Sequence, residues 1–230
     1  MNLFKIIHYV FKNKITHFGE IYRLISFDHF IKLIKLDLKN HSILDVGFNK
    51  GLFRWYFTDL QGCSEYMGVE IDDKYLGIYP NTSFHDFEKN KLNKEFDLIF
   101  CSHVLEHIKN DHQFLKNMAH SLINVNAKLI LRVPIPTSTN IYFRKYNKKS
   151  HKHEEHVRNG YTYLEIKKIL EGLGYKINVS FTSMGTSGIV SHTFFEVLRD
   201  YGLRFQRIFQ LPFIFISLID LYICNNTSPS

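Results

Sequence analysis

The chain has few cysteines and shows no export signal. Only three of its 230 residues are cysteines, Cys63, Cys101 and Cys224, and they are scattered along the chain. They form neither a disulfide framework nor a CxxC metal pair, which favours a reducing compartment. His8 and Lys12 interrupt the apolar residues near the N-terminus, so no signal-peptide core is visible. We therefore expect a cytoplasmic protein.

Long basic runs are also missing. The formal net charge of +7 could attract nucleic acid, an anionic membrane or acidic substrates. Without a basic run of the nucleic-acid type, a generally basic surface is the preferred interpretation, and we expect no nucleic-acid partner. The length suits one α/β domain with modest additions.

No apolar stretch has the length of a membrane span. Residues 208–224 are very apolar, but they are slightly short for a span and include Pro212 and Asp220. A buried or interfacial C-terminal helix is therefore favoured. The arginines within 199–207 would suit anionic headgroups, so peripheral contact with the inner face of the membrane is a second expectation.

From residue 42 onward, segments of strand length alternate with helical patterns. Strands are expected at 42–47, 65–71, 82–84, 96–102, 127–133 and 175–182, and helices at 51–60, 111–123 and 162–172. Such alternation predicts right-handed crossovers and a mostly parallel sheet, which is a Rossmann-like, doubly wound α/β fold.

Three parts are expected along the chain. Residues 1–40 are typical of one or two amphipathic basic helices, which would cap the sheet edge or the mouth of the site, or lie on a membrane surface. Residues 41–183 form the core, and 184–230 form a helical extension. The polar loop at 135–160 has a length typical of a substrate loop or lid.

Residues 42–51 combine a buried strand, a tight turn and a helix start, the arrangement of a nucleotide-cofactor loop. Gly47 and Gly51 are four residues apart, which does not match the dinucleotide fingerprint GxGxxG. Asp45 precedes the turn, where a carboxylate would repel a pyrophosphate but would suit a ligand that carries an ammonium and a sulfonium. The pattern therefore favours S-adenosylmethionine over NAD.

Two further acids follow neighbouring strands. Glu70 ends the second strand, where a carboxylate can accept both ribose hydroxyls. Asp86 follows the short third strand, where it could accept from the exocyclic amine of an adenine. Both positions are consistent with an adenosyl ligand.

Several runs, taken in order, resemble the motifs of class I S-adenosylmethionine-dependent methyltransferases. They are Ile-Leu-Asp-Val-Gly-Phe-Asn-Lys-Gly, Met-Gly-Val-Glu-Ile-Asp, His-Asp-Phe, Phe-Asp-Leu-Ile-Phe-Cys-Ser-His-Val-Leu-Glu-His-Ile, Pro-Ile-Pro and Glu-Glu-His-Val-Arg-Asn-Gly-Tyr-Thr-Tyr-Leu-Glu-Ile. The resemblance covers about 40–180 and depends on the order and spacing of the motifs. It implies that 41–183 is a core that binds S-adenosylmethionine.

The resemblance also implies which residues bind the cofactor. Asp45, Gly47 and Gly51 would shape its methionine side, Glu70 would bind the ribose, and other residues would flank the adenine or line the methyl group. The implied set is Asp45, Gly47, Phe48, Asn49, Gly51, Glu70, Ile71, Asp86, Phe87, Ser102 and His103. The family usually has glycine in place of Asn49, although asparagine tolerates a positive φ.

An alcohol acceptor would need a base to remove its proton. His103, at the end of the fourth strand, is the first candidate, with a role in cofactor contact as its alternative. His156, which begins His-Val-Arg, is the second. His151 and His153, together with Glu155 or His156, could bind a metal ion. Loops rich in Lys, His and Glu are more often solvated, so no metal is expected.

The acceptor is less well specified. No Asn-Pro-Pro-Tyr or Asp-Pro-Pro-Tyr run follows the fourth strand, which argues against methylation of an exocyclic amine in DNA. Arg158 could hold a substrate anion or only a backbone carbonyl. The resemblance favours methyl transfer to a small molecule or a glycan, at oxygen, in polysaccharide biosynthesis. The alternative is a non-catalytic binding or scaffold protein on the same fold, which Asn49 would support.

Overall fold

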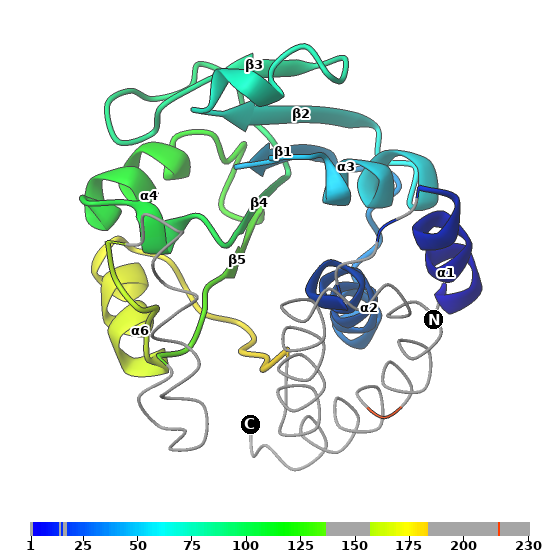
Figure 1. The fold of residues 1–230 in the computed structure, drawn as a ribbon. Coiled ribbons are helices and arrows are strands. Elements are labelled where there is room, and N and C mark those ends of the chain that lie inside the picture. Colours follow the sequence, from blue (N-terminus) through cyan, green and yellow to red (C-terminus); the bar gives the residue numbers. More distant parts are fainter. Residues whose placement is uncertain (1, 14, 16–17, 137–156, 184–215, 217–230) are drawn as a thin grey trace. The chain divides into compact units, whose positions relative to one another are not determined.

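A computed structural model describes residues 2–13, 15, 18–136, 157–183 and 216 (Figure 1). Residues 38–178 belong to one compact unit, and those before 38 belong with those from 179 onward to another. Apart from residue 216, the expected helical extension at 184–230, with its apolar segment 208–224, lies outside the described residues, as does most of the loop at 135–160. Within the described part of the chain, no helix combines the length and hydropathy needed to cross a membrane.

The smaller unit contains two N-terminal helices, α1 (Leu3–Lys12) and α2 (Phe18–Leu33). Asp28 of α2 is buried, and its carboxylate accepts a hydrogen bond from the backbone N–H of Asn2 at 3.0 Å. Lys32 forms an ion pair with the same carboxylate at 2.8 Å. The start of α1 is therefore tied to α2, and the expected helical segment is confirmed.

The larger unit is built on a five-stranded parallel sheet in the order β3-β2-β1-β4-β5 (Figure 1). Its strands are β1 (Ser42–Val46), β2 (Glu65–Glu70), β3 (Thr82–Phe84), β4 (Leu98–Ser102) and β5 (Lys128–Arg132). The chain moves outward from β1 to β3 and then returns to the other side of β1 for β4 and β5. The expected Rossmann-like fold is confirmed, and β1 and β4 flank the switch point at which such sheets bind ligands.

Helices cover both faces of this sheet. They are α3 (Leu52–Trp55), which continues as a turn of π-helix η1 (Tyr56–Leu60), on one face, and α4 (Asp111–Ala119) and α6 (Tyr163–Gly172) on the other. On the α3 face, the ring of Phe100 in β4 packs against Phe53 and Phe57 at centroid distances of 4.6 and 5.3 Å. Because strand side chains alternate, its neighbours Ile99 and Cys101 point to the opposite face.

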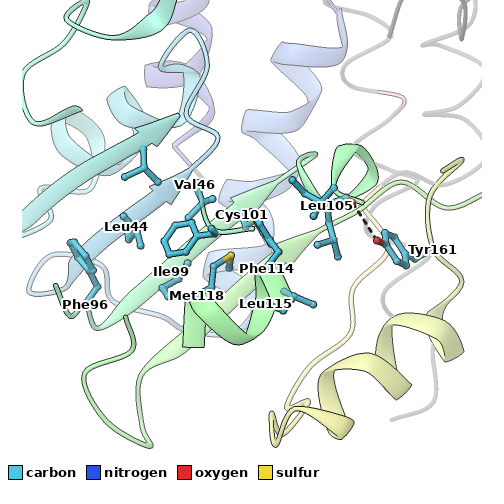
Figure 2. Close-up of a cluster of buried hydrophobic side chains, with 13 residues drawn as sticks. Leu44, Val46, Phe96, Ile99, Cys101, Leu105, Phe114, Leu115, Met118 and Tyr161 are labelled. Carbon is cyan, nitrogen blue, oxygen red and sulfur yellow. Dashed lines mark hydrogen bonds between the residues drawn. The ribbon is translucent and has the colours of Figure 1, made fainter. Parts of the chain in front are cut away.

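On that opposite face lies a cluster of buried side chains (Figure 2). It is formed by Leu44, Val46, Val69, Phe87, Phe96, Ile99, Cys101, Leu105, Ile108, Phe114, Leu115, Met118 and Tyr161. Partly buried residues of α6 pack against it. Burial of each large apolar side chain contributes about 1.5–3 kcal/mol. This core therefore holds rigid the strand ends that carry the candidate site.

Helix α6 begins as its sequence predicts. The Thr162 hydroxyl accepts from the backbone N–H of Glu165 at 3.3 Å, and the Glu165 carboxylate accepts from the backbone N–H of Thr162 at 2.7 Å. This capping box satisfies two N–H groups that have no partner within the helix.

The strand expected at 175–182 is wrong. Tyr175 and Ile177 are partly buried while Lys176 and Asn178 are exposed, so the segment alternates like a strand, yet it pairs with none of the five described strands. The alternation has a different cause, because Tyr175 turns inward and donates its hydroxyl to the carbonyl of Leu115 in α4 at 3.1 Å. Strand formation requires backbone pairing with a neighbour, which a side-chain pattern cannot supply.

Candidate functional site

The carboxyl ends of β2, β1 and β4 lie next to one another. In the parallel register, Val46 pairs with Val69 of β2 on one side and with Cys101 of β4 on the other. The residues that follow these positions therefore emerge at one edge of the sheet. They are the turn after β1, Glu70 and Ser102, so the topology brings together residues far apart in the sequence.

The turn after β1 requires glycine at Gly47. Its φ is +73°, and its N–H donates to the Val69 carbonyl at 2.9 Å. A Cβ atom built on Gly47 would lie 2.3 Å from Cγ2 of Val104, which follows β4. Both the left-handed backbone and the lack of space exclude a side chain. The turn is thus packed closely against the end of β4.

Glu70 joins this turn to β2. Its Oε2 accepts from the backbone N–H of Asn49 at 3.1 Å, and its Oε1 accepts from the N–H of Ile71 at 2.9 Å. Asn49 has a φ of +49°, so it adopts the left-handed conformation in place of a glycine. Each carboxylate oxygen has a second lone pair. The arrangement therefore leaves Glu70 able to accept hydrogen bonds from a ligand. Cofactor binding by Glu70 and Ile71 stays a prediction.

Gly51 opens α3 with a φ of +72° and lies under Tyr79. A Cβ on Gly51 would meet the Tyr79 ring at 2.4 Å, and the Tyr79 hydroxyl donates to the carbonyl of Lys50 at 3.0 Å. The guanidinium of Arg54 lies 5.0 Å from the centre of the same ring. Tyr79 was not predicted from the sequence, because its contact spans 29 residues and no local motif marks it.

Two predicted cofactor residues are buried, Asp45 just before the turn and Phe48 within it. Asp45 is 2% exposed and accepts a hydrogen bond from the Tyr66 hydroxyl at 2.9 Å. Burial raises the pKa of Asp45 to about 7, although the hydrogen bond from Tyr66 acts in the opposite direction. Phe48 is also buried and packs on Gly68, where an added Cβ would lie 2.9 Å from its ring. Direct contact of either residue with a ligand stays a prediction.

Asp86 and Phe87 follow β3 and differ in exposure. Asp86 accepts from the N–H of Glu88 at 2.9 Å and pairs with Lys89 at 2.9 Å. Burial acts to raise the pKa of Asp86, but the hydrogen bonds from Lys89 and Glu88 outweigh it and hold that pKa below its usual value. The Phe87 ring is buried in the core cluster beside Phe114. Contact of Asp86 and Phe87 with an adenine stays a prediction.

Two predicted site residues, Ser102 and His103, lie at the end of β4. Ser102 has a buried hydroxyl oxygen with no hydrogen-bond partner among the described residues. His103 adopts a φ of +57°, and its N–H donates to the Arg132 carbonyl at 2.9 Å. A left-handed backbone at a histidine costs energy and is commonest at functional sites. The predicted roles of both residues stay predictions that this position allows.

The imidazole of His103 lies beside a buried acid. Its Nδ1 is 3.4 Å from Oε1 of Glu106, which is 2% exposed. Burial acts to raise the pKa of Glu106, but the hydrogen bond with His103 and the nearby His107 hold it below its usual value. Glu106 belongs to the same motif as His103, but the sequence pattern alone indicated no role for it.

Arg158 proves to be structural. Its Nη1 donates to the Asp111 carboxylate at 2.5 Å, and its Nη2 donates to the carbonyls of Ile108 and Lys109 at 3.2 and 3.3 Å. The Tyr161 hydroxyl donates to the same carboxylate at 2.9 Å. Of the two interpretations left open for Arg158, the backbone carbonyl is therefore the one observed.

The predicted catalytic residue His156 lies outside the described residues, as do His151, His153 and Glu155. In the part of the chain that is described, no cluster of histidine, cysteine and acidic side chains could hold a metal ion. The segment after this loop is anchored, because the N–H of Tyr161 donates to the Pro134 carbonyl at 2.9 Å.

Comparison with known proteins identifies the family. Residues 18–179, more than half of the chain, match the family model described as a methyltransferase domain. A ubiquinone biosynthesis O-methyltransferase from Rickettsia typhi is 30% identical over 126 residues, which cover 48% of this chain and 50% of that protein. The chain thus spans about half the length of the curated relative that it matches.

Solved structures share the fold. Magnesium protoporphyrin IX methyltransferase from Synechocystis, with SAH bound, gives a TM-score of 0.53 at 17% identity over 69% of this chain and 76% of that one. A putative methyltransferase from Bacillus halodurans gives 0.51 at 16% identity over 64% and 69%. The chain therefore belongs to the methyltransferase-domain family and has the fold of the class I S-adenosylmethionine-dependent enzymes.

Proposed function

We propose that the chain binds S-adenosylmethionine at the carboxyl edge of β1, β2 and β4 and transfers its methyl group to an oxygen of a small-molecule or glycan acceptor. One observation carries the proposal most directly. The carboxylate of Glu70 is hydrogen-bonded to the backbone of Asn49, so an acid that can accept ribose hydroxyls is attached to the glycine turn at the switch point.

The residues present suit this cofactor better than a dinucleotide. Glu70 places a carboxylate at the turn, where a pyrophosphate would be repelled and an ammonium would be attracted. The buried hydroxyl of Ser102 offers a donor and an acceptor that no described residue uses. When bound, S-adenosylmethionine supplies an electrophilic methyl group on a sulfonium.

An oxygen acceptor requires removal of a proton, and His103 is the described residue suited to that role. It lies at the end of β4, beside the switch point, and its imidazole is 28% exposed. Holding the acceptor hydroxyl at this edge would supply a large part of the rate through proximity. The O-methyltransferase name of the Rickettsia typhi relative supports oxygen as the accepting atom.

The acceptor class is the finer part of the proposal. Two nitrogens of Arg158 are engaged by Asp111 and by backbone carbonyls, so this arginine does not require an anionic acceptor. A neutral hydroxyl on a phenolic small molecule or a sugar fits that arrangement. We place the enzyme in the cytoplasm, with peripheral membrane contact through the C-terminal segment. Membrane flotation with and without residues 203–230 tests this contact, and equal partition of both forms would contradict it.

Calorimetric titration of the full chain tests the cofactor. We expect binding of S-adenosylmethionine and of its demethylated product, and no heat with NADH. If S-adenosylmethionine fails to bind at millimolar concentration, the protein is instead a non-catalytic member of the fold. The presence of Asn49 in place of a glycine would support this alternative, but its left-handed φ of +49° preserves the turn.

Transfer of an isotopically labelled methyl group then tests the acceptor. Phenolic small molecules and hydroxyl-bearing oligosaccharides would be incubated with the enzyme and labelled cofactor. Label on only one class identifies the acceptor, whereas label on a nitrogen atom would contradict the assignment to oxygen.

A further inference from the structure

We propose that Glu106 is a positioning residue that holds neutral His103 in the tautomer protonated at Nδ1, which makes Nε2 the nitrogen that takes the acceptor proton. The use of this tautomer in catalysis rests on the proposed methyl transfer. The tautomer itself does not, and it can be measured without any cofactor or acceptor.

The geometry is specific to Nδ1. Oε1 of Glu106 lies 3.4 Å from Nδ1 of His103, a distance typical of a long hydrogen bond that can shorten when substrate binds. A carboxylate can only accept a hydrogen bond, so the proton of a neutral imidazole is drawn to Nδ1. Nε2 is then the basic nitrogen, as in the histidine of a catalytic triad oriented by an acid.

The surroundings of Glu106 fix its place. Its backbone carbonyl accepts from the N–H groups of Val157 and Arg158 at 3.0 and 3.3 Å, and it lies within the short 3₁₀-helix η3 (Leu105–His107). Arg158 in turn is paired with Asp111. The backbone of Glu106 is therefore held both by η3 and by the segment at 157–158. The partner of His103 is thus a buried carboxylate in a fixed position and not a mobile surface group.

The carboxylate is also incompletely satisfied. Oε2 of Glu106 is buried and has no hydrogen-bond partner among the described residues. A buried carboxylate with an unused oxygen is costly to the fold, which favours a role outside stability. When His103 takes a proton from a hydroxyl, the imidazolium that forms lies against this acid, and the charge pair stabilises it.

The charged and titratable groups near Glu106 allow this role. Of the described groups, the imidazoles of His103 and His107 act on its carboxyl group, and both favour the ionised carboxylate. The thiol of Cys101 lies within electrostatic reach, and burial together with Glu106 and Asp45 raises its pKa, so it stays neutral. Among the described residues, no lysine or arginine is a cause of the pKa shift of Glu106, so the carboxylate remains available to the imidazole.

Nitrogen NMR of the full chain, with ¹⁵N-labelled histidine, tests the proposal. The 13 histidines give distinct patterns for the two neutral tautomers, and the His103→Asn variant identifies the signals of His103. At a pH at which the imidazole is neutral, we expect the pattern of a proton on Nδ1. A pattern with the proton on Nε2 of His103 in the unmodified protein would overturn the proposal.

A pair of matched variants shows whether Glu106 is the cause. Glu106→Met removes the acceptor, and His103 should revert to the Nε2–H tautomer that is commoner in solution. Glu88→Met is the control, because Glu88 accepts from the N–H of Asn110 and not from His103. An unchanged His103 pattern in Glu106→Met would also contradict the proposal. Calorimetry with S-adenosylmethionine is a separate readout, so failure of the proposed function would leave this result intact.

Discussion

The carboxylate of Glu70, at the end of β2, accepts a hydrogen bond from the backbone N–H of Asn49, in the turn that follows β1, with 3.1 Å between the two atoms. This bond links adjacent strands at the switch point of the sheet. It also presents one acid to the place where an adenosyl ligand would bind.

Glu70→Gln should weaken S-adenosylmethionine binding by roughly tenfold or more, because a charge-assisted hydrogen bond contributes about 1.5–3 kcal/mol. Calorimetric titration measures the change. Glu65→Gln is the control at the other end of β2, where the carboxylate pairs with Lys94. Equal affinity in Glu70→Gln and the parent protein would remove Glu70 from the site.

Asn49→Gly should stabilise the fold by up to about 1 kcal/mol, since glycine adopts a positive φ without the cost paid by other residues. Asn49→Val should destabilise it, because a β-branched residue is strained at a φ of +49°. Urea unfolding measures both. Asn81→Gly, at a φ of +59° in a different turn, should raise stability in the same way. Only the changes at Asn49 should alter affinity for S-adenosylmethionine.

Gly47→Ala and Gly62→Ala separate backbone strain from steric overlap. Both glycines have a positive φ, +73° and +66°, but a Cβ at Gly47 meets Val104 at 2.3 Å whereas one at Gly62 meets nothing within 4 Å. We expect a loss near 1 kcal/mol at Gly62 and a further 1–3 kcal/mol from overpacking at Gly47. Thermal or urea unfolding gives both values, and equal losses would show that the turn has room to move.

The stability of the fold should depend on pH through Asp45. Burial raises its pKa to about 7 in the folded protein, above the value of 3.8 for an exposed group. The folded state therefore holds the extra proton between these values. The resulting stabilisation is complete below about pH 4 and is lost as the pH rises through 7, on the order of a few kcal/mol.

Asp45→Asn should flatten this dependence, which urea unfolding at pH 4 to 8 would show. Asp97→Asn is a control of opposite sign. The backbone and hydroxyl hydrogen bonds from Ser42 lower the pKa of Asp97, so its contribution is present above the unfolded value and lost as the pH falls. A pH profile unchanged by Asp45→Asn would mean that Asp45 is not the titrating group.

Arg158 and Asp111 should be energetically coupled. A double-mutant cycle with Arg158→Ala and Asp111→Ala, followed by urea unfolding, should give a coupling energy of about 1–3 kcal/mol, because the pair is largely buried and shares Tyr161. The exposed pair of Lys167 and Glu171, 3.7 Å apart, should give about 0.5 kcal/mol or less. Similar coupling in the two cycles would contradict the structural role of Arg158.

Local patterns in the sequence predicted much of the fold. The strand expected at 42–47, the helix expected from 162 and the acid at Glu70 each depend on residues a few positions apart, and the structure has the strand, the helix start and the strand end that they indicate. The expected strand at 175–182 failed for the converse reason. Its alternating side chains follow from the inward turn of Tyr175, and pairing with another strand is not a local property.

What only the tertiary structure decided is which of these residues meet. The hydrogen bond from Asn49 to Glu70 spans 21 residues, the contact of Tyr79 with the turn spans 29, and the ion pair of Arg158 with Asp111 spans 47. The placement of His103 beside a buried Glu106 depends on a left-handed backbone that no motif announces. The sequence by itself determined most of the elements and indicated the family, because periodicity and motif order are local. The structure decided the partners of each site residue, because those depend on how the strands are ordered in the sheet.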